Sequence, residues 1–316
     1  MRRAAAANAL LALCLLASSC GSEKQGSGLR PSPTPTIDAP VTRGPLTVTD
    51  MAGREVRVPD TVSRVVAITP SAADFALALG LQVVGRTSDV PATAVAGVPT
   101  VGSSLSPDFN AIAALKPDLV IGDSAFGGAR MRDFARFVYP VYLLRVANYE
   151  DVLFALGALG EATGRTQQGR DAATALAIET EALVQQVVGR ASPTVLILTG
   201  SGREVYAGSE ATYIGSLVKK LGGTNLLAEA AAGAPIAGFG TVEVTAVATK
   251  NPDVVLILAS GVGGLAAQIT ASPAWANSKA VRDRRVFELD INAFLRAPGP
   301  GVVKSLAALA DLLYPR

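Results

Sequence analysis

The sequence predicts an α/β protein with two related lobes joined by a long helix, and two repeated phrases carry that prediction. "ALKPDLVIGDSA" at residues 114–125 returns as "ATKNPDVVLILAS" at residues 248–260. In each phrase a helical tail meets a Pro-Asp pair, and a continuously apolar run follows. Because proline disfavours helix at the residue before it, the run after it is typical of a strand buried on both faces of a parallel sheet.

A second pair of phrases precedes the first in each half of the chain. "PSAADFALALGLQVVG" at residues 70–85 and "SEATYIGSLVKKLGGTNLL" at residues 209–227 each predict an amphipathic helix that ends in Leu-Gly. Glycine supplies the left-handed cap at such an end. Two landmarks in one order and at similar separations indicate two related lobes, with a cleft between them as the expected place for function.

The first residues have the pattern of a targeting segment. Two arginines precede an apolar stretch that is shorter than the ~20 residues of a membrane-spanning helix, and small residues then lead to Cys20. The pattern resembles the signal peptide of bacterial lipoproteins, which implies removal of residues 1–19 and acylation of the Cys20 sulfur. Cys14 follows a leucine, which is too large for this cleavage pattern. Plain secretion with a stray cysteine is the alternative.

The rest of the chain divides by composition into a tether, two lobes and a helical segment. Residues 20–45 are rich in Gly, Ser, Thr and Pro and are expected to form a flexible tether. Residues 46–148 have strand and helix signals and begin with a hairpin pattern that turns at Gly53. Residues 149–191 are helical without strands, and strand signals resume over residues 192–316.

Composition excludes several classes of function. Loss of residues 1–19 would remove two arginines and no acid, which leaves basic and acidic residues equal in number, so no basic surface for nucleic acid is expected. The chain has no histidine, and Cys20 would be the single cysteine of the mature protein. Cys/His zinc sites, Ser-His-Asp triads and structural disulfides are therefore excluded. An enzyme would have to use Asp, Glu, Tyr, Lys or Ser-Lys chemistry.

One motif favours an enzyme. "GVGGLA" at residues 261–266 follows an apolar run and fits the glycine pattern of a dinucleotide-binding turn, with Asp283 about 20 residues further on. This run lies late in its lobe, whereas a dinucleotide fingerprint normally opens its domain. A tight loop at the edge of the cleft is the favoured interpretation, and a nucleotide-using enzyme is the alternative.

Several phrases resemble one family in consistent order over residues 46–315. "DMAGREVRVP", "RVVAITPSAAD", "ALKPDLVIG", "LGGTN", "NPDVVLI" and "PGPGVVKSLAALADLLYP" are similar to the iron-complex and cobalamin binding proteins of ABC importers. The resemblance implies two Rossmann-like lobes bridged by one long helix, with ligand held between them. Such proteins deliver ferric siderophores, haem or cobalamin to a permease and its ATPase, so the resemblance implies no catalysis and no cofactor. A monomer is expected, and a non-transporting sensor lipoprotein is a further alternative.

The resemblance and the loop positions together give candidate site residues. Ligand contacts are expected from loops that follow strands, at Thr87, Ser88, Ser124, Arg145, Tyr206, Phe239 and Arg296. An anionic siderophore would need Arg86, Arg145, Arg203 and Arg296 to converge, and haem would need a tyrosine such as Tyr206 or Tyr213.

The family implies a carboxylate on each lobe that docks to the permease. Asp74 retains that chemistry in the first lobe. Ser216 stands at the matching position of the second lobe, and Glu210, at the start of the same predicted helix, is the candidate substitute. A local explanation exists for the first-lobe residues, since Ser71 suits a helix N-cap and Asp74 follows three residues later.

Overall fold

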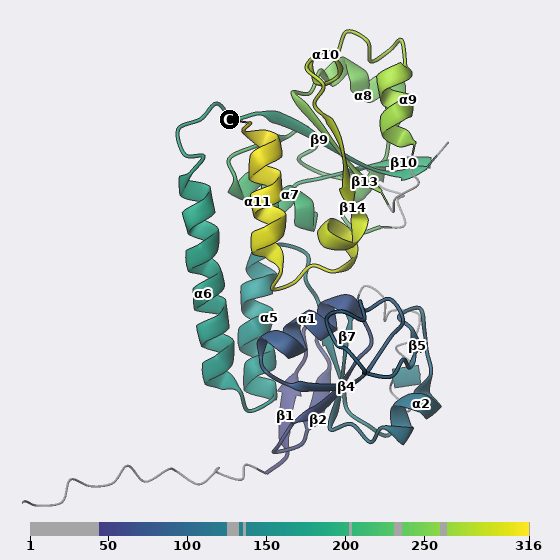
Figure 1. Ribbon diagram of the computed structural model, residues 1–316, viewed down its shortest axis with the longest axis vertical. Helices are drawn as coiled ribbons and strands as arrows, with labels where there is room; N and C mark the ends of the chain where they lie inside the picture. Colours follow the sequence, from purple (N-terminus) through teal and green to yellow (C-terminus); the bar gives the residue numbers. More distant parts are fainter. Residues whose placement is uncertain are drawn as a thin grey trace, which may run out of the picture. The chain divides into compact units, whose positions relative to one another are not determined.

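The computed structural model describes residues 44–124, 133–134, 137–201, 204–230, 236–259 and 264–315, and every statement below concerns these residues. The expectations for the signal peptide, Cys20 and most of the tether lie outside this range. Two α/β lobes are present, as the sequence predicts, and the helices between them stand beside both lobes (Figure 1).

The first lobe contains a small hairpin and a parallel sheet. The hairpin pairs β1 (Leu46–Thr49) with β2 (Glu55–Val58) and turns at Gly53, whose φ is 80°. The sheet has the order β4-β3-β7-β8. Its strands are β3 (Arg64–Ala67), β4 (Gln82–Arg86), β7 (Leu119–Asp123) and β8 (Val141–Leu144), and the lobe also holds α1 (Pro70–Ala78), α2 (Phe109–Ala114) and the short pair β5 (Gly102–Ser103) and β6 (Ser106–Pro107).

The second lobe contains a mixed sheet of order β12-β10-β9-β13-β14, with β11 also paired to β9. β10 runs antiparallel to both of its neighbours, and the other pairings are parallel. The strands are β9 (Thr194–Ser201), β10 (Glu204–Gly208), β11 (Thr224–Asn225), β12 (Phe239–Thr241), β13 (Val254–Ala259) and β14 (Val286–Asp290). The helices are α7 (Tyr213–Lys220), α8 (Val244–Val247), η2 (Ala248–Lys250), α9 (Leu265–Ala271), α10 (Lys279–Arg282), η3 (Asn292–Arg296) and α11 (Val302–Leu313).

The repeated Pro-Asp phrases have the same structural role in both lobes. The Asp118 carboxylate accepts the backbone N–H of Arg64 at 2.8 Å, and the Asp118 N–H donates to the Arg64 carbonyl at 2.8 Å. In the second lobe, Asp253 accepts from the N–H of Thr194 at 2.7 Å and donates to its carbonyl at 2.9 Å. Each aspartate thus fixes the first residue of the neighbouring strand, and this reciprocal pair sets the register of β7 on β3 and of β13 on β9.

The residues around these phrases also match between the lobes. Lys116 and Asn251, each directly before the proline, adopt φ values of 46° and 48°. Gly80 and Gly222 end α1 and α7 with φ values of 65° and 81°. Each glycine lets its N–H bond back to the last helical turn, as a left-handed C-terminal cap requires.

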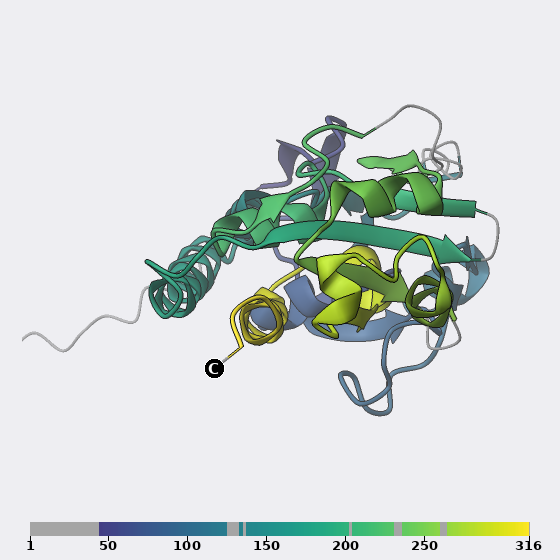
Figure 2. The same cartoon turned by 90° about the horizontal axis from the view of Figure 1, so that it is seen from above.

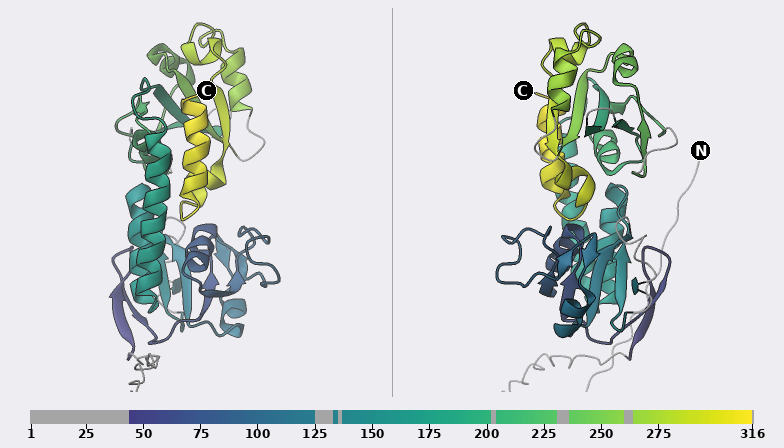
Figure 3. Two further views of the ribbon diagram at one scale, coloured as in Figure 1. Left: turned by 60° about the vertical axis from the view of Figure 1, so that its left-hand side comes forward. Right: turned by 90° about the vertical axis from the view of Figure 1, so that its right-hand side faces the viewer.

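Helices α5 (Tyr149–Ala162) and α6 (Thr166–Gln185) lie side by side and connect the lobes (Figures 1 and 3). Close packing depends on Gly169, where an added Cβ would lie 2.5 Å from the Leu156 carbonyl oxygen. Beyond α6, the Arg190 guanidinium donates to the carbonyl of Tyr314 at 2.8 Å. Seen from above, α6 and α11 are both viewed nearly end-on, which shows that their axes run alongside one another (Figure 2).

The largest buried apolar cluster is continuous from lobe to lobe. It contains Phe75 of the first lobe, Leu156 of α5, Leu176 of α6, and Leu217 and Leu309 of the second lobe. A shared core of this kind resists separation of the lobes, because opening it would expose apolar surface to water. Only small lobe closure is therefore expected on ligand binding.

The start of α1 differs from the expectation. Thr69, not Ser71, is the N-cap, and its Oγ1 accepts the N–H of Ala72 at 3.2 Å. Pro70 occupies the first helical position, where its fixed φ and missing N–H are tolerated, so the cap falls one residue before the proline. The Ser71 hydroxyl instead donates to the carbonyl of Pro298 at 2.7 Å, across the lobes. Asp74 then lies beyond the first turn and is not part of a capping box.

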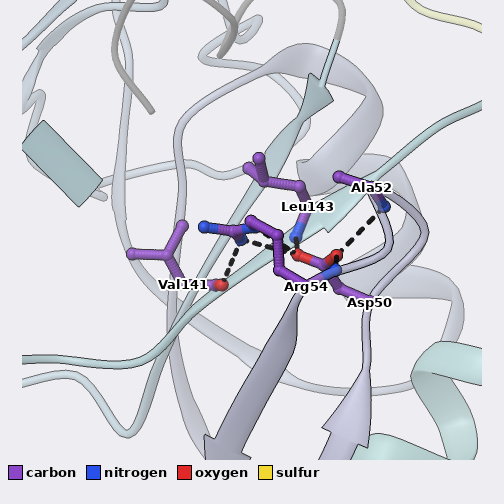
Figure 4. A network of polar contacts seen from close by, with 5 residues as sticks. All are labelled: Asp50, Ala52, Arg54, Val141 and Leu143. Atoms are coloured by element: carbon purple, nitrogen blue, oxygen red, sulfur yellow. Dashed lines mark hydrogen bonds and ion pairs between the residues drawn. The ribbon is translucent and has the colours of Figure 1, made fainter. Parts of the chain in front are cut away.

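A buried carboxylate anchors the hairpin to the first sheet (Figure 4). Asp50 accepts the N–H groups of Ala52 at 3.0 Å and Leu143 at 3.1 Å. It also accepts hydrogen bonds from Nε and Nη2 of Arg54, at 2.9 and 2.6 Å. The same Nη2 donates a hydrogen bond to the Val141 carbonyl at 2.7 Å. The side chain of Asp50 is fully buried, so these donors replace its hydration.

Asp50→Ala is expected to lower the free energy of unfolding by about 3–5 kcal/mol, because it leaves the Arg54 charge and the Leu143 N–H without their acceptor. Denaturant unfolding monitored by circular dichroism measures this. Asp60→Ala is the matched control, since Asp60 is exposed in the next loop and should change the unfolding free energy by less than about 0.5 kcal/mol. Equal effects of the two variants would contradict the anchoring role of Asp50.

Candidate functional site

A cavity of about 1100 Å³ lies between the two lobes. Both lobes and both connecting helices contribute to its wall. The first lobe and the connecting helices contribute Asp123, Ser124, Arg145, Val146, Ala147, Asn148, Glu150, Glu181 and Val184. The second lobe contributes Glu210, Ala211, Thr212, Tyr213, Ser216, Lys219, Lys220, Ile236, Ala237, Gly238, Phe239 and Leu295.

The first-lobe wall is built at the carboxyl ends of two parallel strands. Asp123 ends β7 and Ser124 directly follows it, and Arg145 directly follows β8. Asn148 caps α5 by accepting the N–H of Asp151 at 2.9 Å, and the Asp151 carboxylate accepts the N–H of Ala147 at 2.8 Å. This pair of bonds holds the loop between β8 and α5 in one conformation, with its side chains along the cavity.

The second-lobe wall comes from the segment that follows an antiparallel strand. β10 runs opposite to β9, so the loop after Gly208 lies beside the middle of β9 rather than beyond its carboxyl end. Thr212 caps α7 by accepting the N–H of Gly215 at 3.1 Å, which places Tyr213 in the first turn. The wall therefore consists of a capped helix and the segment before β12.

The two walls meet through polar contacts between α5 and α7. The Ser216 hydroxyl accepts the N–H of Tyr149 at 3.1 Å and donates to the Tyr213 carbonyl at 2.7 Å. The Lys220 ammonium lies 4.2 Å from the centre of the Tyr149 ring, within cation–π range. Ser216 thus satisfies one of the N–H groups left free at the start of α5.

The structure brings three of the predicted ligand contacts together. Ser124, Arg145 and Phe239 line the cavity. Glu210, expected at the permease interface, also lines it, and its carboxylate pairs with the Lys219 ammonium at 3.1 Å. Ser216, which stands at the matching docking position of the second lobe, lines the cavity as well.

The other predicted contacts lie outside the cavity wall. Thr87 is buried in the first lobe, and the N–H of the neighbouring Ser88 donates to the Gly102 carbonyl at 2.8 Å, which holds this loop against the β5–β6 pair. The Tyr206 hydroxyl donates to Glu204 on the same strand at 3.2 Å. Arg296 is exposed at the end of η3. Arg203 lies outside the described residues.

Sequence reasoning omitted several residues of the wall, and some carried a signal. Asn148 before "YED" and Thr212 before "YIGS" are both N-cap residues in front of a predicted helix. Because each follows a strand, a capping search at strand ends would have found them. Lys219 and Lys220 carried no such signal, since lysines near a helix C-terminus are ordinary.

Asp74 lies on α1 beside the segment that connects η3 with α11. A Cβ added at Gly299 would lie 3.9 Å from the Asp74 Cβ and 3.4 Å from the Phe75 ring. Burial raises the pKa of the Asp74 carboxyl, and the charge of Lys304 lowers it in part. Burial also raises the pKa of Tyr213, while a hydrogen bond with the Gly299 backbone opposes that shift.

The dinucleotide alternative does not agree with the second sheet. Gly264 lies beyond the carboxyl end of β13, whereas Asp283 precedes β14, which pairs in parallel with β13 and begins opposite Val255. The two features thus lie near opposite ends of the sheet, although a ribose-binding acid must stand near the glycine turn. The other glycines of the motif, residues 261–263, lie outside the described residues.

The part of the chain that the structure describes contains no cluster of three or more His, Cys, Asp or Glu side chains placed to hold a metal ion. No helix in the same residues has the length and apolar character needed to cross a membrane.

Two α/β lobes around a large cleft, with a shared core behind it, define the class of two-lobed binding proteins. The Periplasmic binding protein family model matches residues 65–293. The chain belongs to that family, and the resemblance inferred from its motifs is confirmed.

Relatives agree with this assignment. An uncharacterized ABC transporter substrate-binding lipoprotein of Bacillus subtilis, YvrC, is 22% identical over 86% of each chain. The Fe(3+)-citrate-binding protein YfmC of the same organism is 21% identical over 92% of this chain and 90% of its own. The crystal structure of Staphylococcus aureus IsdE complexed with heme matches with a TM-score of 0.67 and 21% identity, covering 80% of this chain and 99% of that one.

Phe239 is a structural residue as well as part of the wall. It is buried, and a Cβ added at Gly208 would lie 3.0 Å from its ring. Phe239→Ala is therefore expected to cost about 3–5 kcal/mol of unfolding free energy, measured by denaturant titration. Phe239→Leu, which retains most of the volume, should cost clearly less. If Phe239→Ala left stability unchanged, the ring would belong to the ligand surface alone, as the sequence suggested.

Proposed function

We propose that this protein captures an iron chelate of low net charge in the interlobe cleft and delivers it to an ABC permease and its ATPase. The observation that carries the proposal is the cavity of about 1100 Å³ between the lobes, which is large enough for a chelate of this size class. Membership of the binding-protein family supports capture without catalysis.

The described wall favours iron that arrives already coordinated. It contains no histidine or cysteine, and no metal-binding cluster occurs among the described residues. Tyr213 lines the cavity, but burial raises the pKa of its hydroxyl, which disfavours the phenolate form that would ligate haem iron. Tyr206, the other tyrosine considered for haem, does not line it. A ferric siderophore, whose chelator completes the iron coordination, therefore suits these residues better than haem held by an axial protein ligand.

Charge in the described wall favours a weakly charged ligand. Asp123, Glu150, Glu181 and Glu210 stand against Arg145, Lys219 and Lys220. Lys219 forms an ion pair with Glu210, and Lys220 lies over the Tyr149 ring. Arg145 is the cation of the described wall that forms neither an ion pair nor a cation–π contact within the described residues. Arg86 donates to the Thr87 and Val90 carbonyls, and Arg296 lies outside the wall. The described arginines thus do not form the cluster that a strongly anionic catecholate would need.

Cobalamin is the second candidate, because it also carries little charge and needs no iron ligand from the protein. Ferrichrome, a neutral ferric trihydroxamate, ferric enterobactin, a strongly anionic catecholate, and cyanocobalamin form a suitable panel. Titration calorimetry is the appropriate readout, since Trp275 is fully buried with its Nε1 donating to the Val244 carbonyl and is not part of the cavity wall. Preferential binding of ferric enterobactin would contradict the proposal.

Arg145→Gln is expected to weaken ferrichrome binding about ten-fold or more, because a charge-assisted hydrogen bond to a chelate oxygen would be lost. The melting temperature should stay unchanged, since Arg145 is exposed and forms no ion pair within the described residues. Arg57→Gln, at an exposed position on β2 outside the cavity wall, is the control and should bind ferrichrome normally. If both variants bound ferrichrome with equal affinity, Arg145 would not contact the ligand.

Delivery is proposed to use Asp74 of the first lobe, whose carboxylate would meet a cationic group of the permease. A desolvated ion pair at an interface contributes far more than an exposed pair does. Glu210 remains the proposed carboxylate of the second lobe, although its pairing with Lys219 would have to be exchanged for a permease contact. Ser216, which is engaged with Tyr149, offers no charge to a partner.

The protein is further proposed to be held at the outer face of a membrane by lipid on Cys20. Each buried CH₂ of an acyl chain contributes about 0.8 kcal/mol, so two or more chains hold a protein firmly. Cys20→Ser should move the protein from the membrane fraction to the soluble fraction or block its processing, as fractionation and mass spectrometry would show. Cys14→Ser should leave anchoring intact. Soluble, unacylated wild-type protein would overturn the lipoprotein assignment.

A further inference from the structure

Lys220 is a cation of the cavity wall that contacts an aromatic ring instead of a carboxylate. It stands in the last turn of α7, and its side chain lines the cavity. Its ammonium lies 4.2 Å from the centre of the Tyr149 ring. Within the described residues the ammonium forms no ion pair and has no hydrogen-bond acceptor. Its N–H groups are therefore available to an acceptor in the cavity.

The ring beneath Lys220 is a fixed platform, because both the backbone and the side chain of Tyr149 are held. Tyr149 is buried as the first residue of α5, and it belongs to the apolar core that the lobes share. Its N–H donates to the Ser216 hydroxyl at 3.1 Å. Ser216 precedes Lys220 by four residues, so both lie on the same face of α7. The ammonium thus contacts a held ring and loses less freedom when a ligand binds it than a free lysine would.

The acids of the same wall do not pair with Lys220 in the described residues. Glu210 forms its ion pair with the neighbouring Lys219, at 3.1 Å. Glu181 accepts a hydrogen bond at 2.6 Å from a glutamine of its own helix, α6. Glu150 lies in the first turn of α5, where the helix dipole stabilises its charge. The positive charge of Lys220 therefore stays available to a ligand.

We propose that Lys220 is a specificity-determining residue that binds one carboxylate at the periphery of the chelate. A charge-assisted hydrogen bond is about twice as strong as a neutral one. A ligand with one carboxylate can form this bond without breaking an ion pair of the wall, whereas a polyanionic ligand would also have to separate Glu210 from Lys219. Tyr149 is the positioning residue that holds the ammonium in place. This inference rests on the proposed capture of an iron chelate in the cleft.

Three ferric trihydroxamates provide a matched test on the full chain, because they share one chelate core and differ at one end. Ferrioxamine B ends in an ammonium, its N-acetyl derivative is neutral, and its N-succinyl derivative ends in a carboxylate. In titration calorimetry the succinyl derivative should bind about ten-fold more tightly than the acetyl derivative, as one charge-assisted hydrogen bond implies. Ferrioxamine B should bind most weakly. Tightest binding of ferrioxamine B would overturn the proposal.

Lys220→Met removes the charge but retains most of the length of the side chain. It should reduce the ratio of the succinyl affinity to the acetyl affinity from about ten to about one, because the charge-assisted bond is lost. The affinity for the acetyl derivative should stay within about two-fold of the wild-type value. Lys250→Met, on exposed η2 outside the wall, is the control and should keep the wild-type ratio. A preference that persists in Lys220→Met would show that another residue binds the carboxylate.

The positioning role of Tyr149 is tested through the same affinity ratio, which a general weakening of the cavity leaves unchanged. Tyr149→Phe keeps an aromatic face and should retain the preference for the carboxylate. Tyr149→Leu removes that face and should lower the ratio about two- to five-fold, the loss that one cation–π contact implies. An unchanged ratio in Tyr149→Leu would exclude the positioning role. If that variant does not fold, the Lys220→Met ratio still decides the selectivity.

The same titrations separate this inference from the proposed function. If the acetyl and succinyl derivatives bind the wild-type protein with equal affinity, the capture of a chelate stands and the carboxylate selectivity is wrong. If none of the three compounds binds, the proposed ligand is wrong and the selectivity falls with it.

Discussion

The arrangement of the site depends on one constraint, which is that both lobes share a single apolar core. The core runs from Phe75 through Leu156 and Leu176 to Leu309 without a break. Since apolar contacts are not directional, the core alone does not fix where the lobe surfaces meet. Directional bonds do so at its edges, and Ser216 with Tyr149 and Ser71 with Pro298 are two of them. The cavity lies at the edge of this core, because Tyr213 and Phe239 belong to both the core and the cavity wall.

This position at the edge of the core explains why both charged and apolar residues line the cavity. Polar groups at the ends of strands and helices remain hydrated there, or they pair with one another, as Glu210 does with Lys219. A bound ligand must replace that hydration. A highly charged ligand would bind such a wall weakly. To form ion pairs with the ligand, the wall would first have to break the ion pairs between its own side chains.

Much of the fold was predictable, because it follows from local pattern. The Pro-Asp phrases and Leu-Gly caps are local signals. Asp118 and Asp253 each accept the N–H of the first residue of the neighbouring strand, so the same phrase has the same structural role in both lobes. The site was less predictable, because it depends on strand direction and on contacts distant in sequence. The second-lobe wall follows an antiparallel strand, which no local pattern near Tyr206 indicates. Ser71 looked like a cap because its true partner, Pro298, is 227 residues away.

The difference between the lobes has a physical consequence for docking. Each lobe has a helix with a left-handed glycine cap that contacts α5, but the polar side chains of these two helices are used differently. On α1, Asp74 is half-buried and meets a charge from the second lobe. On α7, Ser216 is neutral and bonds the backbone of α5. The pKa of Asp74 stays raised despite Lys304, so a further cation would stabilise its charged form, whereas Ser216 carries no charge and is held by a helix terminus. In the proposed docking, Asp74 of α1 could therefore contribute a charge that Ser216 of α7 cannot.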